Sequence, residues 1–142
     1  MLLKKDPYER MLQLQEDAHA WEAKGHEAAF EARKLEAQAA ELSLKAQRIR
    51  EKAEARSARS RSLHHRAYTM LHEDQAARKE LMVEKARQLE LETAALRDRA
   101  RGVESDAERL LTAARSRLAE SARWLANARG SLREAEATKA LL

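Results

Sequence analysis

Apolar residues recur along two long segments of the chain in steps of three and four. The first run contains Met11, Leu14, Ala18, Trp21, Gly25, Ala28, Ala32, Leu35, Ala39, Leu42, Ala46, Ile49 and Ala53. One set of these positions holds Ala or Gly throughout, and the other set holds mostly large side chains. A pattern sustained over so many heptads predicts a long helix that packs along one seam. Gly25 is in phase, so we expect it to be a small core residue inside that helix.

The second run has the same character and contains Met82, Ala86, Leu89, Thr93, Leu96, Ala100, Val103, Ala107, Leu110 and Ala114. It then slips by one residue and continues as Leu118, Ala122, Leu125 and Leu132. The run keeps its phase across Gly102, which favours one uninterrupted helix. However, the string from Ser105 to Glu108 resembles a helix-capping box, so a break near residues 102–105 remains an alternative.

Two such runs fit together as an antiparallel pair, because the small positions of one helix then face the large positions of the other. In one register Leu35 faces Ala114 and the turn falls at residues 72–75. In the other register Leu35 faces Ala86 and the turn falls in the Ser-rich residues 57–62. We favour the later turn, because the first seam stays in phase through Leu63 and Met70. A single rod in a parallel dimer is a third possibility.

A second apolar stripe repeats every seven residues on the opposite side of the first helix. It consists of Ala23, Phe30, Ala37 and Leu44. A two-helix hairpin would leave Phe30 and Leu44 in water, and exposed apolar stripes normally mark an interface. We therefore expect an all-α, long antiparallel coiled-coil hairpin that dimerises into a four-helix bundle. The alternative is a three-helix bundle with breaks near residues 57–62 and 102–105.

The composition agrees with this fold class and gives an expectation for the cellular compartment of the protein. The 142 residues amount to a single domain, 37% of them are charged, and only 3 are Gly and 1 is Pro, which is typical of coiled coils. Cysteine is absent, and no apolar run approaches the roughly 20 residues that span a bilayer. The first residues lack the apolar core of a signal peptide, so we expect a cytoplasmic protein.

Residues with catalytic or metal-binding potential are few. Glu16 and His19 have the spacing of a di-iron carboxylate motif, but only one copy exists and both residues lie off the seam. His65 and His72 would stand about 10 Å apart on a helix, too far to share one ion. No phosphate-binding loop, nucleophile elbow or zinc-protease motif occurs. The sequence therefore predicts neither an enzyme nor a cofactor, a metal site or a small-molecule substrate.

A basic segment is the more promising candidate for binding. Residues 48–66 carry a local balance of +5, which is seven basic residues minus two acidic ones. Its candidate docking residues for an anion or a partner are Arg48, Lys52, Arg56, Arg59, Arg61 and Arg66. Such a segment suits an acidic protein, nucleic-acid phosphates or an anionic lipid surface. No aromatic residue is interleaved for base stacking, so nucleic acid is not favoured.

These features predict a coiled-coil structural or adaptor protein that self-associates and binds other proteins through helical surfaces. Its expected interface residues are the stripe from Ala23 to Leu44 together with Trp124, which flanks the second seam. In its length, its long antiparallel helices and its lack of an active site, the chain resembles FliJ-like export stalk proteins. That resemblance implies a stalk-type subunit of a secretion or ATPase machine as one alternative. A nucleic-acid or anionic-membrane binder is the other.

Overall fold

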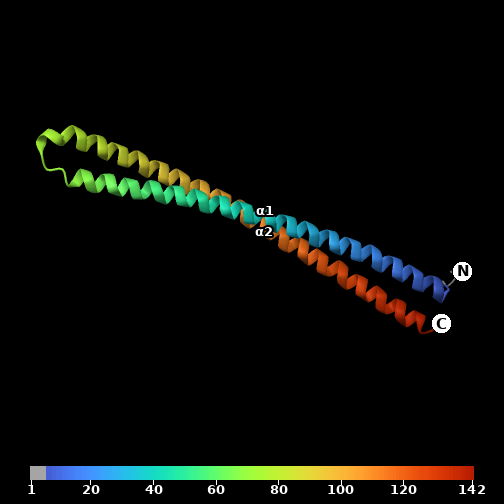
Figure 1. Ribbon diagram of the computed structural model, residues 1–142. Coiled ribbons are helices and arrows are strands. Elements are labelled where there is room, and N and C mark those ends of the chain that lie inside the picture. Colours follow the sequence, from blue (N-terminus) through green and yellow to red (C-terminus); the bar gives the residue numbers. More distant parts are fainter. Residues whose placement is uncertain (1–5) are drawn as a thin grey trace. The chain divides into compact units, whose positions relative to one another are not determined.

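Two long helices make up almost all of the structure. The computed structural model describes residues 6–142 and contains α1 (Pro7–Tyr68), the 3-10 helix η1 (Glu73–Gln75) and α2 (Ala76–Lys139) (Figure 1). Helix accounts for 94% of the described residues, and no strand occurs among them. The abundance of Ala, Leu, Glu, Lys and Arg explains this, because these residues favour helix most strongly. The first residues, from which we expect no signal peptide, include residues 1–5, which lie outside the described part.

The turn lies where the later register predicted it. Between α1 and η1 the chain turns through Thr69 and His72 without any residue at positive φ in the described part. The Thr69 hydroxyl donates a hydrogen bond of 2.9 Å to the Arg66 carbonyl, and the Met70 amide donates one of 3.2 Å to the Ala67 carbonyl. These bonds satisfy carbonyl groups at the end of α1 that would otherwise lack a partner. The turn therefore needs neither Gly nor Pro.

The structure contradicts the alternative topologies. Residues 57–62 lie inside α1 and residues 102–105 lie inside α2, so the earlier turn, the three-helix chain and the uninterrupted rod are all wrong. Ser60 was misleading because serine often marks a turn, whereas here it is a buried seam residue. Its hydroxyl donates a hydrogen bond of 3.0 Å to the Ala86 carbonyl on the other helix, which satisfies the polar group.

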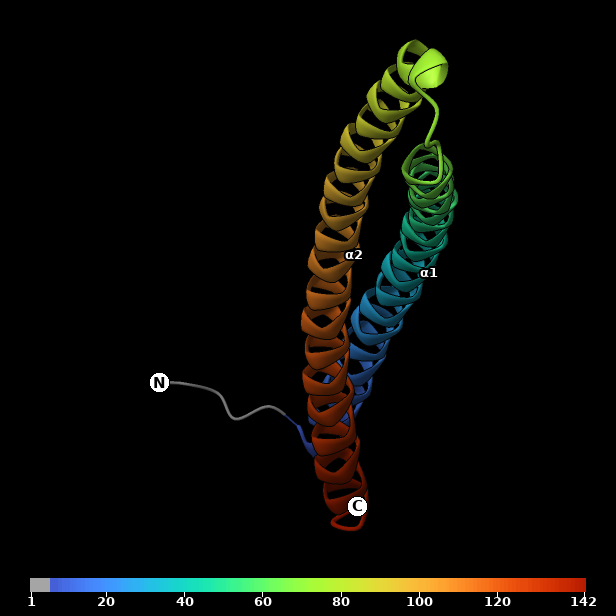
Figure 2. The same ribbon diagram turned by 90° about the vertical axis from the view of Figure 1, so that its left-hand side faces the viewer.

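The contacts divide the hairpin into two compact units. Unit 1 contains residues 6–37 and 110–142 of the described chain, and unit 2 contains residues 38–109. In each unit α1 and α2 lie side by side and run in opposite directions (Figures 1 and 2). In unit 1, Arg117 lies 3.2 Å from Glu31; in unit 2, Arg50 lies 2.6 Å from Glu104. Both contacts fit the predicted register with the later turn.

A row of small residues on each helix forms the centre of the interface in both units. On α1 this small row is Ala18, Gly25, Ala32, Ala39, Ala46, Ala53, Ser60 and Ala67. On α2 it is Ala86, Thr93, Ala100, Ala107, Ala114, Ser121, Ala128 and Ala135. Every member is buried. Small side chains let two helix backbones approach closely, which explains how the Ser131 hydroxyl reaches the Leu14 carbonyl at 2.6 Å in unit 1.

The predicted slip in the second seam is correct for Leu125 and Leu132 and wrong for Leu118 and Ala122. Leu118 is 43% exposed and Ala122 is also exposed, whereas Ser121, Ala128 and Ala135 continue the small row in phase. What changes after Ala114 is only the position of the large side chains, which moves by one residue to Leu125 and Leu132. The predicted second run did not include Ser121, so this continuity was missed.

Candidate protein-docking surfaces

The outer stripe, defined as Ala23, Phe30, Ala37 and Leu44, lies uncovered on α1. Phe30 is 67% exposed in unit 1 and Leu44 is 55% exposed in unit 2. Ala23 and Ala37 are exposed as well. The small row occupies the side of α1 that contacts α2, so a residue two positions before each small residue points away from that contact. No described segment of the chain covers Phe30 or Leu44.

Trp124 already has a partner within unit 1. The Lys24 ammonium group lies 4.6 Å from the centroid of the Trp124 ring, which is the geometry of a cation–π interaction. Trp124 and Leu125 are both half-buried, so the ring rests against the helix pair and leaves part of its surface in water. Its predicted role in an interface stays a prediction.

One side of unit 2 is balanced in charge, and we call it the paired face: Arg50, His64, Glu90, Arg97 and Glu104. Arg50 forms two hydrogen bonds with Glu104, of 2.6 and 2.8 Å, through its Nε and Nη2 atoms. These bonds raise the pKa of the Arg50 guanidinium and lower the pKa of the Glu104 carboxyl. Arg97 lies 3.7 Å from Glu54, which extends the pairing along α1.

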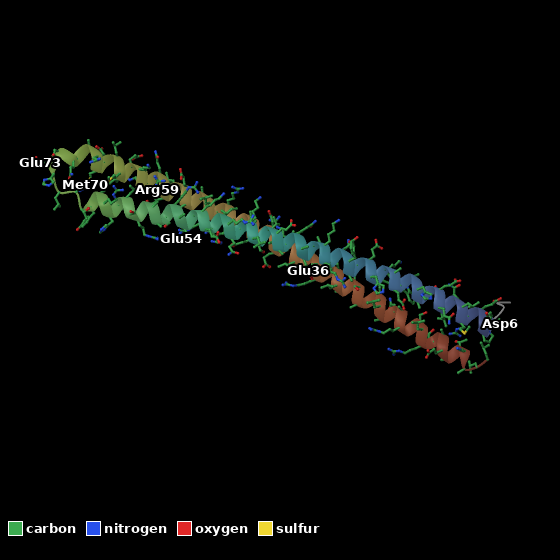
Figure 3. The ribbon with its side chains drawn as sticks, viewed as in Figure 1. Asp6, Glu36, Glu54, Arg59, Met70 and Glu73 are labelled. Atoms are coloured by element: carbon green, nitrogen blue, oxygen red, sulfur yellow. The ribbon has the colours of Figure 1, made fainter. Side chains whose placement is uncertain are left out.

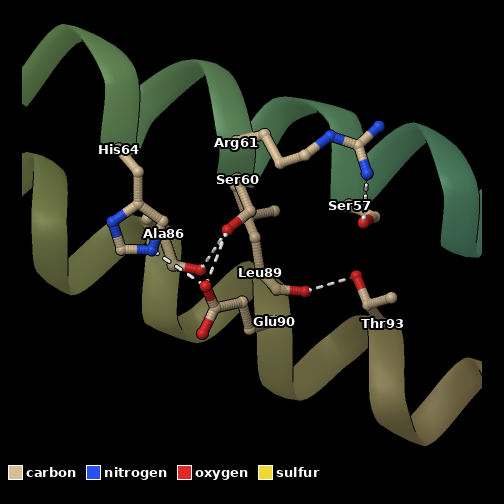
Figure 4. Close-up of polar contacts among 8 residues, drawn as sticks. All are labelled: Ser57, Ser60, Arg61, His64, Ala86, Leu89, Glu90 and Thr93. Atoms are coloured by element: carbon tan, nitrogen blue, oxygen red, sulfur yellow. Dashed lines mark hydrogen bonds and ion pairs between the residues drawn. The ribbon is translucent and has the colours of Figure 1, made fainter.

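The turn-proximal end of the paired face is held by a small polar cluster (Figure 4). The Glu90 carboxylate accepts a hydrogen bond of 3.3 Å from the Ser60 hydroxyl and lies 2.8 Å from Nε2 of His64. Ser60 and His64 belong to α1 and Glu90 to α2, so the cluster ties the two helices together. Because Ser60 is buried, His64 is half-buried and Glu90 is exposed, the cluster closes the edge of the seam.

The opposite side of unit 2 contains a groove with a volume of about 640 Å³. We call it the cationic groove; it is lined by Lys52, Ala55, Arg56, Arg59, Lys85, Gln88, Leu89 and Glu92. Arg56 and Glu92 form an ion pair of 3.0 Å. Lys52, Arg59 and Lys85 are exposed and form no ion pair with any residue of the described chain. Charged side chains such as Arg59 line the outside of the hairpin in Figure 3.

Three of the six predicted docking residues line the cationic groove, and the other three do not. Lys52, Arg56 and Arg59 line the cationic groove. Arg61 instead lies 3.2 Å from Glu54 on its own helix and also donates a hydrogen bond to the Ser57 hydroxyl. Arg48 and Arg66 are exposed and lie outside the lining of the groove. The basic segment is therefore not one uniform surface.

Lys85 completes the groove and was missed by the sequence analysis. It belongs to α2, so no inspection of residues 48–66 could bring it into the site. Only the register of the hairpin places it beside Lys52 and Arg59. The sequence does contain a signal for this, because the later turn brings residues near 88 opposite residues near 60.

The candidate metal residues do not assemble into a site. No group of three or more His, Asp or Glu side chains able to hold a metal ion occurs among the described residues. His19 lies 3.9 Å from Glu22 rather than with Glu16, and His64 contacts Glu90. These contacts agree with exposed helix faces.

No family model, curated protein or solved structure matches this chain. The contacts and charges described above are therefore the basis for assigning a function. Within residues 6–142, neither helix has a stretch with the length and apolar character needed to span a bilayer.

Proposed function

We propose that this protein is a non-enzymatic coiled-coil adaptor that self-associates and binds other proteins through its helical surfaces. The observation that carries the proposal is the exposure of the outer stripe, with Phe30 at 67% and Leu44 at 55%. Burying a side chain of this size stabilises a complex by roughly 1.5–3 kcal/mol. An exposed Phe and Leu at heptad spacing, flanked by small Ala23 and Ala37, provides a surface to which another helix can pack closely.

A second copy of the same chain is the partner that we propose for the outer stripe. Two hairpins joined through their α1 helices give a four-helix bundle, the arrangement that places such stripes against each other.

Light scattering of the purified protein tests this proposal. The wild type should have the mass of a dimer, and the double variant F30D/L44D should have the mass of a monomer, because unpaired charges buried in an interface cost several kcal/mol. The double variant should keep its helix content by circular dichroism, since both positions are exposed in the hairpin.

The matched control is L81D/L91D, which changes two leucines that are 71% and 72% exposed on α2, away from the outer stripe. This control should retain the mass of a dimer. A wild type that is monomeric over the whole concentration range would overturn the proposal and would favour a stalk-type subunit. A double variant that remains dimeric would show that the copies associate through another surface.

A further inference from the structure

The two sides of unit 2 differ in how their flanking charges are arranged. On the paired face, the flanking residues are Arg50 and His64 of α1 and Glu90, Arg97 and Glu104 of α2, which gives two cations and two anions with His neutral. On the other side, the flanking row of α1 is Lys45, Lys52, Arg59 and Arg66, and that of α2 is Lys85, Glu92, Arg99 and Asp106. This side has six basic and two acidic residues, a balance of +4.

This asymmetry is unusual for a pair of helices that are stabilised by each other alone. Residues that flank the seam of a coiled coil normally pair with opposite charges across it. The paired face follows this rule, whereas the cationic groove brings Lys52 and Arg59 of α1 together with Lys85 of α2. Like charges at this spacing destabilise the pair slightly, and an acidic partner would reverse the sign of that contribution.

The lining of the groove distinguishes between classes of acidic partner. Ala55 and Leu89 also line the groove, so its lining combines apolar groups with the cations. No aromatic side chain lines it, which removes the stacking surface that single-stranded nucleic acids use. Phosphate groups would contact only the cations and leave Ala55 and Leu89 without a partner. An amphipathic helix with a narrow apolar stripe and acidic flanks matches both features.

We propose that the cationic groove of unit 2 binds an acidic amphipathic helix of a partner protein, which packs as a third helix against α1 and α2. Lys52, Arg59 and Lys85 would pair with carboxylates on the flanks of that helix, and Ala55 and Leu89 would contact its apolar stripe. Arg56 keeps its pair with Glu92 and forms part of the wall of the groove. This inference rests on the proposed adaptor function and names the class of partner.

Fluorescence anisotropy with designed peptides tests the groove. The probe is a labelled 28-residue helical peptide with Ala and Leu along one stripe and Glu on both flanks. Two matched peptides accompany it: one has Gln in place of every Glu, and the other has the same composition in an order that destroys the stripe. A DNA duplex and vesicles containing phosphatidylserine are measured under the same conditions. The whole chain is used throughout.

We expect the acidic amphipathic peptide to bind and the two matched peptides to bind at least about tenfold more weakly. The groove variant K52E/R59E/K85E should weaken binding of the acidic peptide by about tenfold or more. The control variant R61E/R87E/R101E has the same change in net charge at exposed positions outside the groove and should bind as the wild type does. Circular dichroism shows whether each variant is folded, and raising the salt concentration should weaken binding.

Three results would overturn the inference. The acidic peptide fails to bind, the control variant loses binding as fully as the groove variant does, or the disordered-stripe peptide, the DNA or the vesicles bind as tightly as the acidic peptide. The last result would identify the groove as a general anion-binding surface. Light scattering on the same samples separates this test from the proposed self-association: F30D/L44D should change the mass and keep peptide binding, and K52E/R59E/K85E should do the reverse.

Discussion

Gly25 of α1 and Leu125 of α2 lie so close in unit 1 that a Cβ atom at residue 25 would be 2.8 Å from Cγ and 2.9 Å from Cδ2 of Leu125. The same Cβ atom would lie 3.3 Å from the carbonyl oxygen of Ser121. A glycine inside a helix costs about 1 kcal/mol relative to alanine, so its presence in the small row needs a structural reason. The close approach of Leu125 and of the α2 backbone provides that reason.

Replacing Gly25 by alanine should therefore give a less stable protein than replacing another helical glycine by alanine. Gly130 lies in the same unit, and a Cβ atom added there meets no atom within 4 Å. We expect G130A to raise the free energy of unfolding by about 0.5–1 kcal/mol and G25A to be less stable than G130A by about 1–3 kcal/mol. Urea denaturation followed by circular dichroism measures both values. Equal gains in the two variants would mean that the helices move apart without cost.

The small row as a whole should resist larger side chains. Ala53 is 1% exposed in unit 2, so A53L would force the two helices apart and should lower the free energy of unfolding by about 1–3 kcal/mol. Ala94 is exposed on α2 of the same unit and is the control. Because A94L projects into solvent, it should change stability by less than about 0.5 kcal/mol. A tolerated A53L would show that the interface is loosely packed.

The sequence predicted the first helix and the position of the turn correctly because both depend on the phase of one seam. Gly25 was identified as a core residue from its place in that phase, and the later turn followed from the continuity through Leu63 and Met70. The fold class required only that two runs of the same character exist. No knowledge of distances between the helices was necessary.

The errors arose where a small polar residue occupies a seam position. Ser60, within the Ser-rich residues 57–62, was taken as evidence for an earlier turn, and Ser121 was left out of the second run, although both are buried. A serine hydroxyl can donate to a backbone carbonyl, as Ser60 does to Ala86, so it is tolerated where only small volume matters. The cationic groove was incomplete for a different reason. Lys85 joins it across the hairpin, and residues on two helices are combined only when the register is applied to the exposed positions.

The ion pair between Arg50 and Glu104 predicts a specific dependence of stability on pH. The lowered pKa of Glu104 means that the folded state favours the ionised carboxylate. Its contribution is complete above the usual carboxyl pKa of about 4.3 and is lost as the pH falls through the lowered pKa of the folded state. The difference in unfolding free energy between wild type and E104Q should therefore be constant near neutral pH and shrink in acid.

Chemical denaturation at a series of pH values and at low salt measures this difference. The effect should be small, because the pair is exposed to solvent and salt screens it. Glu51 is exposed on α1 and has no ion pair within the described residues, so E51Q is the matched control. A difference for E104Q that grows in acid, or one no larger than that of E51Q, would contradict the prediction.

Ser60 provides a test of whether the seam requires small volume or a hydrogen bond between the helices. The residue is 2% exposed, and its hydroxyl contacts both the Ala86 carbonyl and the Glu90 carboxylate. In S60A the volume is kept, and both acceptors retain other partners, because the Ala86 carbonyl lies within α2 and Glu90 is exposed and contacts His64. The lost hydrogen bond costs about 0.5–1.5 kcal/mol, and the better helix propensity of alanine offsets part of it.

We therefore expect the free energy of unfolding of S60A, measured by urea denaturation, to lie within about 1 kcal/mol of the wild-type value. The variant S62A, at an exposed position of α1, is the control for helix propensity alone. If S60A instead loses more than about 2 kcal/mol relative to S62A, the hydroxyl itself holds the two helices together, and the explanation of the small row by volume alone is wrong.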